Sequence, residues 1–191
     1  LLDGKVYFEL PVDLINTDML IGSTVTSISD NGNAVVGSKP TDLLHVMFTR
    51  NKTHVQLRQV NTDYITGSTQ IDEALRKSTL GAIISNQKIQ AYNNDSTAIV
   101  FDMTGVFLSD NKKMSPFDRN SIYGMYNRTE NYQSDCSYIS QIKAFKDNVS
   151  IKSCLSYTFS VSNSQGASLI KDRPFTAEMT RSIMLLKEKP Y

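Results

Sequence analysis

The sequence predicts a mainly β fold: an antiparallel sandwich or barrel of about nine strands built from sequential hairpins, with one short amphipathic helix. Two observations predict it. Short segments rich in β-branched and aromatic residues alternate apolar and polar side chains with period two, and clusters of Asn, Asp, Ser and Gly separate them. No repeat of fixed period and no shift in composition marks a boundary, so we expect the 191 residues to form a single domain, 1–191.

Four strands are predicted in the first 60 residues. Residues 6–10 alternate until a proline ends the strand, and residues 19–28 run up to a cluster of turn-forming residues. Residues 43–49 and 54–60 are typical of a hairpin with a tight turn between them.

The register of this hairpin follows from its turn. If residues 51–52 form a two-residue turn, Phe48 faces Val55 and Val46 faces Leu57. One face of the hairpin is then apolar along its length, as a strand pair that covers a core requires.

A single segment changes from period two to helical spacing. Residues 69–79 place Ile71, Ala74 and Leu75 on one face, and Thr69 can cap the first turn. The spacing predicts the one short amphipathic helix over about 69–79.

The middle of the chain predicts a second hairpin and a long connection. Residues 83–92 and 97–108 alternate as strands on either side of an Asn- and Asp-rich turn. Residues 109–135 are polar and lack apolar periodicity, so we expect a connection that holds a short helix near 121–126.

The last third of the chain predicts three more strands. Residues 137–146 and 149–161 form a hairpin that turns at Asp147 and Asn148, and residues 176–186 form the final strand after a proline.

The same hairpin decides the state of the two cysteines. In this register Cys136 faces Phe159, and Cys154 lies five residues from that partner on the opposite face. The strand rise then separates the two residues by roughly 17 Å. A disulfide needs Cα atoms within about 7 Å, so we expect two free and mostly buried thiols.

Composition and spacing argue against several classes of function. A formal net charge of +1 removes the usual argument for nucleic-acid binding, and the chain has no apolar run of about 18 residues that could form a transmembrane segment. His45 and His54 lie roughly 13 Å apart in the predicted hairpin, too far to share a metal ion. His-Glu-x-x-His, Cys-x-x-Cys and Gly-x-Ser-x-Gly motifs are absent from the sequence. The residues therefore predict no catalytic group, no metal site and no cofactor.

One carboxylate lies in an unusual place. Asp102 interrupts an apolar strand, where a partly buried carboxylate needs hydrogen-bond donors. We expect it to anchor a loop rather than to take part in chemistry.

Several segments follow one another in an order that carries more information than any of them alone. They read KVYFELP at 5–11, VFDMT at 100–104, SYI at 137–139 with DNV at 147–149, and RSIMLL at 181–186. In this order they resemble the domain of unknown function that precedes the catalytic domain of large bacterial zinc-dependent metalloproteases.

The resemblance implies a context rather than an activity. The zinc-binding helix of such proteases lies downstream, so zinc is expected only in a following catalytic domain. The chain itself is then a non-catalytic accessory domain, outside the cytoplasm in the periplasm, at the cell surface or secreted. It would pack against that catalytic domain or position a protein or peptide substrate for it. Structural roles are expected for Asp102, Asp147, Asn148 and Arg181.

Two observations bear on this interpretation. The chain begins at Leu1 without a signal segment, so we expect it to be excised from a longer polypeptide. An inhibitory cover over the zinc would have to supply Cys136 or an acid from 109–135. The alternative is a free-standing surface module that binds glycan or protein ligands.

Overall fold

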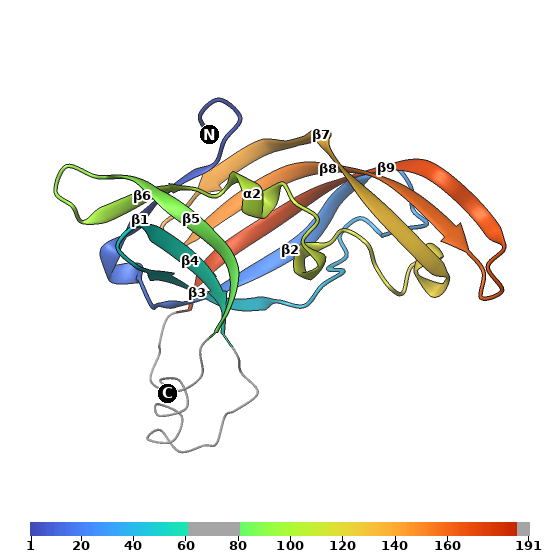
Figure 1. Ribbon diagram of the computed structural model, residues 1–191, viewed down its shortest axis with the longest axis horizontal. Helices are drawn as coiled ribbons and strands as arrows, with labels where there is room; N and C mark the ends of the chain where they lie inside the picture. Colours follow the sequence, from blue (N-terminus) through green and yellow to red (C-terminus); the bar gives the residue numbers. More distant parts are fainter. Residues whose placement is uncertain (61–80, 187–191) are drawn as a thin grey trace, which may run out of the picture.

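The computed structural model describes residues 1–60 and 81–186, which form a mainly β fold. Nine strands make one sheet in the order β1-β6-β5-β4-β3-β2-β9-β8-β7, and all neighbours are antiparallel. The sheet is curled into a half-barrel (Figure 1), so the predicted antiparallel class and strand number are confirmed. The strands are Tyr7–Pro11 (β1), Asp18–Ile28 (β2), Leu44–Arg50 (β3), His54–Gln59 (β4), Ala82–Tyr92 (β5), Ala98–Asp102 (β6), Asn127–Ala144 (β7), Asn148–Ser162 (β8) and Ser168–Leu185 (β9).

Helix is scarce in the described part of the chain. The α-helix α2 has four residues, Thr104–Phe107, and three short 3-10 turns are η1 (Val12–Leu14), η2 (Lys112–Met114) and η3 (Tyr123–Met125). The predicted helix over 69–79 lies outside the described residues.

The first hairpin has its turn one residue later than predicted. Phe48 lies opposite Leu57, and Arg50 lies opposite Val55, so the predicted pairing of Phe48 with Val55 is wrong by two residues. The cause is Asn51, whose N–H donates to the carbonyl of His54 at 3.0 Å and whose Oδ1 accepts from the N–H of His54 at 2.8 Å. A shift of two residues leaves each side chain on its predicted face.

Strand β6 ends at Asp102, six residues before the predicted end of that strand. Asp102 Oδ1 accepts a hydrogen bond from the backbone N–H of Thr104 at 2.8 Å, and the chain then forms α2. Thr104 Oγ1 in turn accepts the N–H of Val6 at 2.8 Å. A local side-chain bond therefore overrides the apolar alternation that predicted a longer strand.

Strand β7 begins at Asn127, ten residues before the predicted start, so the predicted connection ends earlier. Its first half is polar and half-exposed, with Tyr132 packed on Tyr157 of β8 at a ring-centroid distance of 5.4 Å. The short helix expected near 121–126 corresponds to the 3-10 turn η3.

The hairpin of β7 and β8 also differs in register from the prediction. Ala144 lies opposite Val149 rather than Ile151, because the N–H of Phe145 donates to the carbonyl of Asn148 at 2.8 Å and closes the turn around Asp147. Further along, the pairing is irregular between Gln133 and Tyr138.

Strand β9 begins at Ser168, eight residues before the predicted start, and contains Pro174. Proline lacks the N–H that a central strand needs. Strand β2 ends at Ile28 opposite Ala177, so along the segment that contains Pro174 only β8 pairs with β9. The proline therefore lies at a local edge of the sheet.

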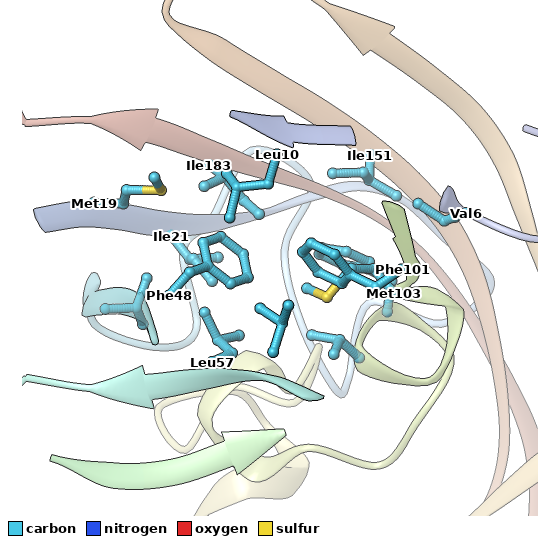
Figure 2. Close-up of a cluster of buried hydrophobic side chains, with 14 of the residues drawn as sticks. Val6, Leu10, Met19, Ile21, Phe48, Leu57, Phe101, Met103, Ile151 and Ile183 are labelled. Carbon is cyan, nitrogen blue, oxygen red and sulfur yellow. The ribbon is translucent and has the colours of Figure 1, made fainter. Parts of the chain in front are cut away.

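The half-barrel encloses two apolar clusters. The larger one lies where β1–β6 curl over β8 and β9, and Figure 2 shows Phe48 and Phe101 at its centre among aliphatic side chains from other strands. The second lies along the extended part of β8 and β9. Its buried members are Val25, Ala34, Phe117, Leu155, Tyr157, Phe159, Val161, Phe175, Ala177 and Met179.

Candidate functional site

A buried arginine holds the connection after β6 against the sheet. Arg181 of β9 is 1% exposed, and its Nη1 donates to the carbonyl of Phe107 at 3.2 Å and to Ser153 Oγ. Its Nη2 donates to the carbonyl of Met114 at 3.0 Å. Burial lowers the pKa of Arg181 to about 10, so the guanidinium is still charged at neutral pH. The side chain therefore holds α2 and η2 against β9.

The anchored connection forms one wall of a polar cleft of about 940 Å³. The segment 39–43 before β3 and Leu44, the first residue of β3, also line this cleft. Lys112 lies 3.2 Å from a Glu130 carboxylate oxygen and 2.9 Å from one of Asp110. The Nε of Arg128 bonds the other oxygen of Glu130 at 2.9 Å. Lys112 and Arg128 are thus both paired with carboxylates, and Lys39, Lys113 and Arg119 also line the cleft.

The rest of the cleft is polar with an aromatic rim. The guanidinium of Arg128 lies 4.7 Å from the centroid of the Phe117 ring, and its Nη1 donates to Ser121 Oγ at 3.2 Å. Tyr126, which is 46% exposed, and Leu43, which is 54% exposed, also line the cleft. A polar ligand with one flat face would suit this surface.

A second concave site is apolar and lies at the seam where the half-barrel does not close. This seam groove, of about 390 Å³, runs between β1 and the tip of the β7–β8 hairpin. Phe145 is 59% exposed and Tyr7 is 37% exposed at its rim, whereas Leu10 and Ile183 on the lining are buried. Other lining residues are Phe8, Leu14, Met19, Phe48, Ile142, Val149 and Leu185.

The residues expected to have structural roles lie in three different places. Asp102 bonds Thr104 at the start of α2, and Arg181 bonds the end of α2. Asp147 in the β7–β8 turn and Asn148 at the start of β8 line the seam groove, where the carbonyl of Asp147 accepts the N–H of Leu185 at 3.1 Å. The structure therefore does not gather them into one site.

The two cysteines form no disulfide in the structure, and both thiols are free. Cys136 is exposed, so the prediction that both are mostly buried is wrong; Cys154 is half-buried. The expected facing of Cys136 and Phe159 is also wrong, because Phe159 pairs with Glu130. Cys136 lies in the irregular part of β7, and its carbonyl accepts a hydrogen bond from Ser156 Oγ at 3.0 Å.

The histidines have separate surroundings. His45 Nε2 lies 3.2 Å from a carboxylate oxygen of Asp18, and His54 Nδ1 lies 2.8 Å from Thr53 Oγ1. Within residues 1–60 and 81–186, no three His, Cys, Asp or Glu side chains are placed to hold a metal ion. The same residues contain no helix long and apolar enough to cross a membrane.

Neither concave site is evident from the sequence. The seam groove depends on the curl of the sheet, which brings β1 beside a hairpin more than a hundred residues away. The only local signal is Phe145, an apolar residue in an exposed turn. The cleft depends on where Arg181 holds the connection.

Comparison with known proteins gives a family match. A family model described as a domain of unknown function (DUF5117) matches residues 37–191. No curated protein and no solved structure matches the chain.

Proposed function

The chain belongs to the family described as a domain of unknown function (DUF5117), and from this premise we propose that it is a non-catalytic accessory domain of an extracytoplasmic bacterial zinc metalloprotease-like protein. In this role it binds a partner protein surface, that of a catalytic domain following it in the same polypeptide. Docking there would hold the domain next to the protease and help to position a protein or peptide substrate.

The seam groove is the observation that carries the proposal. Phe145 and Tyr7 present apolar surface to solvent at the mouth of a groove whose floor is the core of the half-barrel. Exposed apolar surface that is continuous with a concave site is typical of a docking site for another protein. Zinc chemistry would belong to the catalytic domain.

The surroundings of the charged residues support a non-catalytic role. Asp102 is bonded to the start of α2, Glu130 is paired with Arg128, and Arg181 is bonded to backbone carbonyls. Each of these groups thus has a structural task in the described part of the chain. A general acid or base must reach a substrate in an open site; of the three, Glu130 alone lines one, and there it is paired with Lys112 and Arg128.

The test uses the polypeptide encoded after Tyr191. The domain and that following segment are expressed separately, and their Kd is measured by isothermal titration calorimetry. We expect Phe145→Ser to raise the Kd by at least about tenfold, because it removes an exposed apolar anchor. Leu169→Ser is the matched control, since Leu169 is 53% exposed but lies on β9 outside the groove. A stop codon after Tyr191, or equal losses in the two variants, would contradict the proposal.

The polar cleft favours a second candidate, a free-standing surface module that binds glycans. Its half-exposed Tyr126 offers a flat face beside amide and hydroxyl groups. On this alternative, a stop codon follows Tyr191, and a glycan array shows binding that Tyr126→Ala abolishes. An array with no binding above background would contradict this glycan-binding alternative.

A further inference from the structure

We infer that the seam groove takes up one extended segment of the partner protein as an added β-strand on the outer edge of β1. This inference rests on the proposed function, because it specifies how the partner surface docks. The occupant is a stretch of polypeptide with apolar side chains at every second position.

The backbone hydrogen bonds of β1 show which of its groups face outward. The N–H of Met103 donates to the carbonyl of Val6, and the N–H of Val12 donates to the carbonyl of Thr97, both at 2.8 Å. Hydrogen-bonded pairs alternate along an antiparallel ladder, so the even-numbered residues of β1 point their backbone groups at β6. The N–H and C=O groups of Tyr7 and Glu9 therefore point away from β6.

No described strand covers that edge, since β1 stands at one end of the strand order. Backbone groups at an open edge form a template for another strand. The side chains of Tyr7 and Glu9 are also exposed, and neither blocks the edge as an inward-pointing charge would. Only Pro11, which lacks an N–H, limits the ladder at the end of β1.

The opposite side of the groove carries the other open edge of the sheet. The bond from the N–H of Phe145 to the carbonyl of Asn148 sets the alternation in β7. Ile142 and Ala144 then fall in non-hydrogen-bonded pairs, and their backbone groups point away from β8. Both residues line the same groove as β1. The two ends of the strand order thus meet across one apolar groove.

The chemistry of the groove specifies the occupant. Its lining includes Phe8, Leu10 and Ile183, which would contact apolar side chains projecting inward from an added strand. An occupant that covers the edge displaces water from the N–H and C=O groups of Tyr7 and Glu9, and must replace it with peptide-like partners, which a lipid chain lacks. An extended polypeptide satisfies both requirements at once, with backbone bonds for affinity and alternate side chains for specificity.

The first experiment selects the occupant from random peptides. The domain is immobilised and screened against a phage-displayed random heptapeptide library. We expect enrichment of sequences with apolar residues at alternate positions. Enrichment of helix-periodic or highly charged peptides, or no enrichment, would overturn the inference.

The second experiment locates the binding on β1. The most enriched peptide is synthesised, and hydrogen exchange of the intact domain is followed by NMR with and without it. We expect the amides of Tyr7 and Glu9 to exchange more slowly with the peptide bound, because they become donors in a ladder. Unchanged exchange at both residues would show that no strand is added there.

A matched pair of variants tests the backbone contribution. Glu9→Pro removes an outward N–H, and Glu9→Gln keeps that N–H while removing the charge. We expect Glu9→Pro to raise the Kd for the selected peptide by at least about tenfold, and Glu9→Gln to change it less than about twofold. Equal effects of the two variants would contradict strand addition. If Glu9→Pro does not fold, the amide exchange of the unmodified domain decides.

These outcomes separate the two proposals. If Phe145→Ser weakens binding of the following segment while the amides of Tyr7 and Glu9 stay unprotected in that complex, the accessory role stands and strand addition fails. If the amides are protected by the peptide but the following segment does not bind, the accessory role fails alone. A concentration-dependent dimer of the domain that protects the same amides would assign the edge to a second copy and overturn the inference.

Discussion

The Nη2 group of Arg181 donates a hydrogen bond to the carbonyl oxygen of Met114 at 3.0 Å in the interior of the protein. The two residues are 67 positions apart, and the bond joins β9 to the η2 turn of the long connection. The connection is also held by backbone bonds from Asp118 to Asn33 and from Tyr123 to Gly32, and Arg181 adds its attachment to the sheet at η2.

We predict that Arg181→Met lowers the free energy of unfolding by about 2–4 kcal/mol. The variant leaves the carbonyls of Phe107 and Met114 buried without their donor. Urea denaturation measures the change. Lys171→Met, which removes an exposed charge from the same strand, serves as the control and is expected to change stability by less than about 0.5 kcal/mol. Equal effects would mean that the buried hydrogen bonds contribute nothing.

The stability of the domain should depend on pH through Tyr157. Burial raises the pKa of this phenol. Above the ordinary tyrosine pKa of about 10, the native state then binds more protons than the unfolded state, so the free energy of unfolding falls as the pH rises. Arg181, whose pKa is lowered by burial to about 10, acts in the opposite sense between about pH 10 and 12.5.

Tyr157→Phe removes the phenol, which lowers the free energy of unfolding as the pH rises. The variant keeps Arg181, which raises the free energy of unfolding over the same range. We therefore predict that the variant loses less stability than the native sequence between about pH 8 and about pH 11. Urea denaturation at both values measures the difference, with the exposed Tyr92→Phe as control. The prediction fails if Tyr157→Phe and the native sequence have parallel pH profiles.

Asp102 should stabilise the start of α2 as an acceptor rather than as a charge. Asp102→Ala is expected to lower the free energy of unfolding by about 1 kcal/mol, because the N–H of Thr104 loses its partner. Asp102→Asn keeps an oxygen in that place and is expected to retain most of the stability. Thermal denaturation of both variants measures this, and a similar loss in both would point to the charge instead.

The two thiols should differ in reactivity. We predict that iodoacetamide modifies the exposed Cys136 before the half-buried Cys154, because access limits the second reaction. Peptide mass mapping at successive times measures the order, and denaturation in guanidinium is expected to make the two rates similar. Modification of Cys154 first would contradict the described β7–β8 pairing.

The strands with strong apolar alternation can be predicted from the sequence, and those without it cannot. Residues 19–28 are recognisable because side chains at every second position are buried along most of the strand. The first half of β7 offers Tyr132 almost alone among polar residues, since its side chains are half-exposed or exposed. The pattern of residues 97–108 predicts one strand, because Asp102 can either continue a strand or accept a hydrogen bond that ends it. Only the fold determines that it accepts the N–H of Thr104.

Registers and sites are harder to predict for a different reason. Asn51 can stand inside a turn or close it, and both arrangements bury the same faces, so the sequence pattern cannot choose between them. Arg181 resembles any polar residue in an alternating strand, because its partners are carbonyls far away along the chain. The seam groove exists only once the sheet has curled.

The pairing of β2 with β9 determines when the sheet can form. Met19 lies opposite Leu185, so the two ends of the described chain meet in the middle of the strand order. Strands β3–β8 lie between these two strands in the sequence. The chain loses conformational entropy when it closes a loop of that length, and the contacts between β2 and β9 offset this loss only afterwards. This order favours slow folding. On the ribosome, the first residues of β2 can pair with β3 early, but its other edge has no partner until β9 has been synthesised. A nascent chain stalled before β9 would expose two apolar strand edges, and would therefore be a natural client for a holding chaperone.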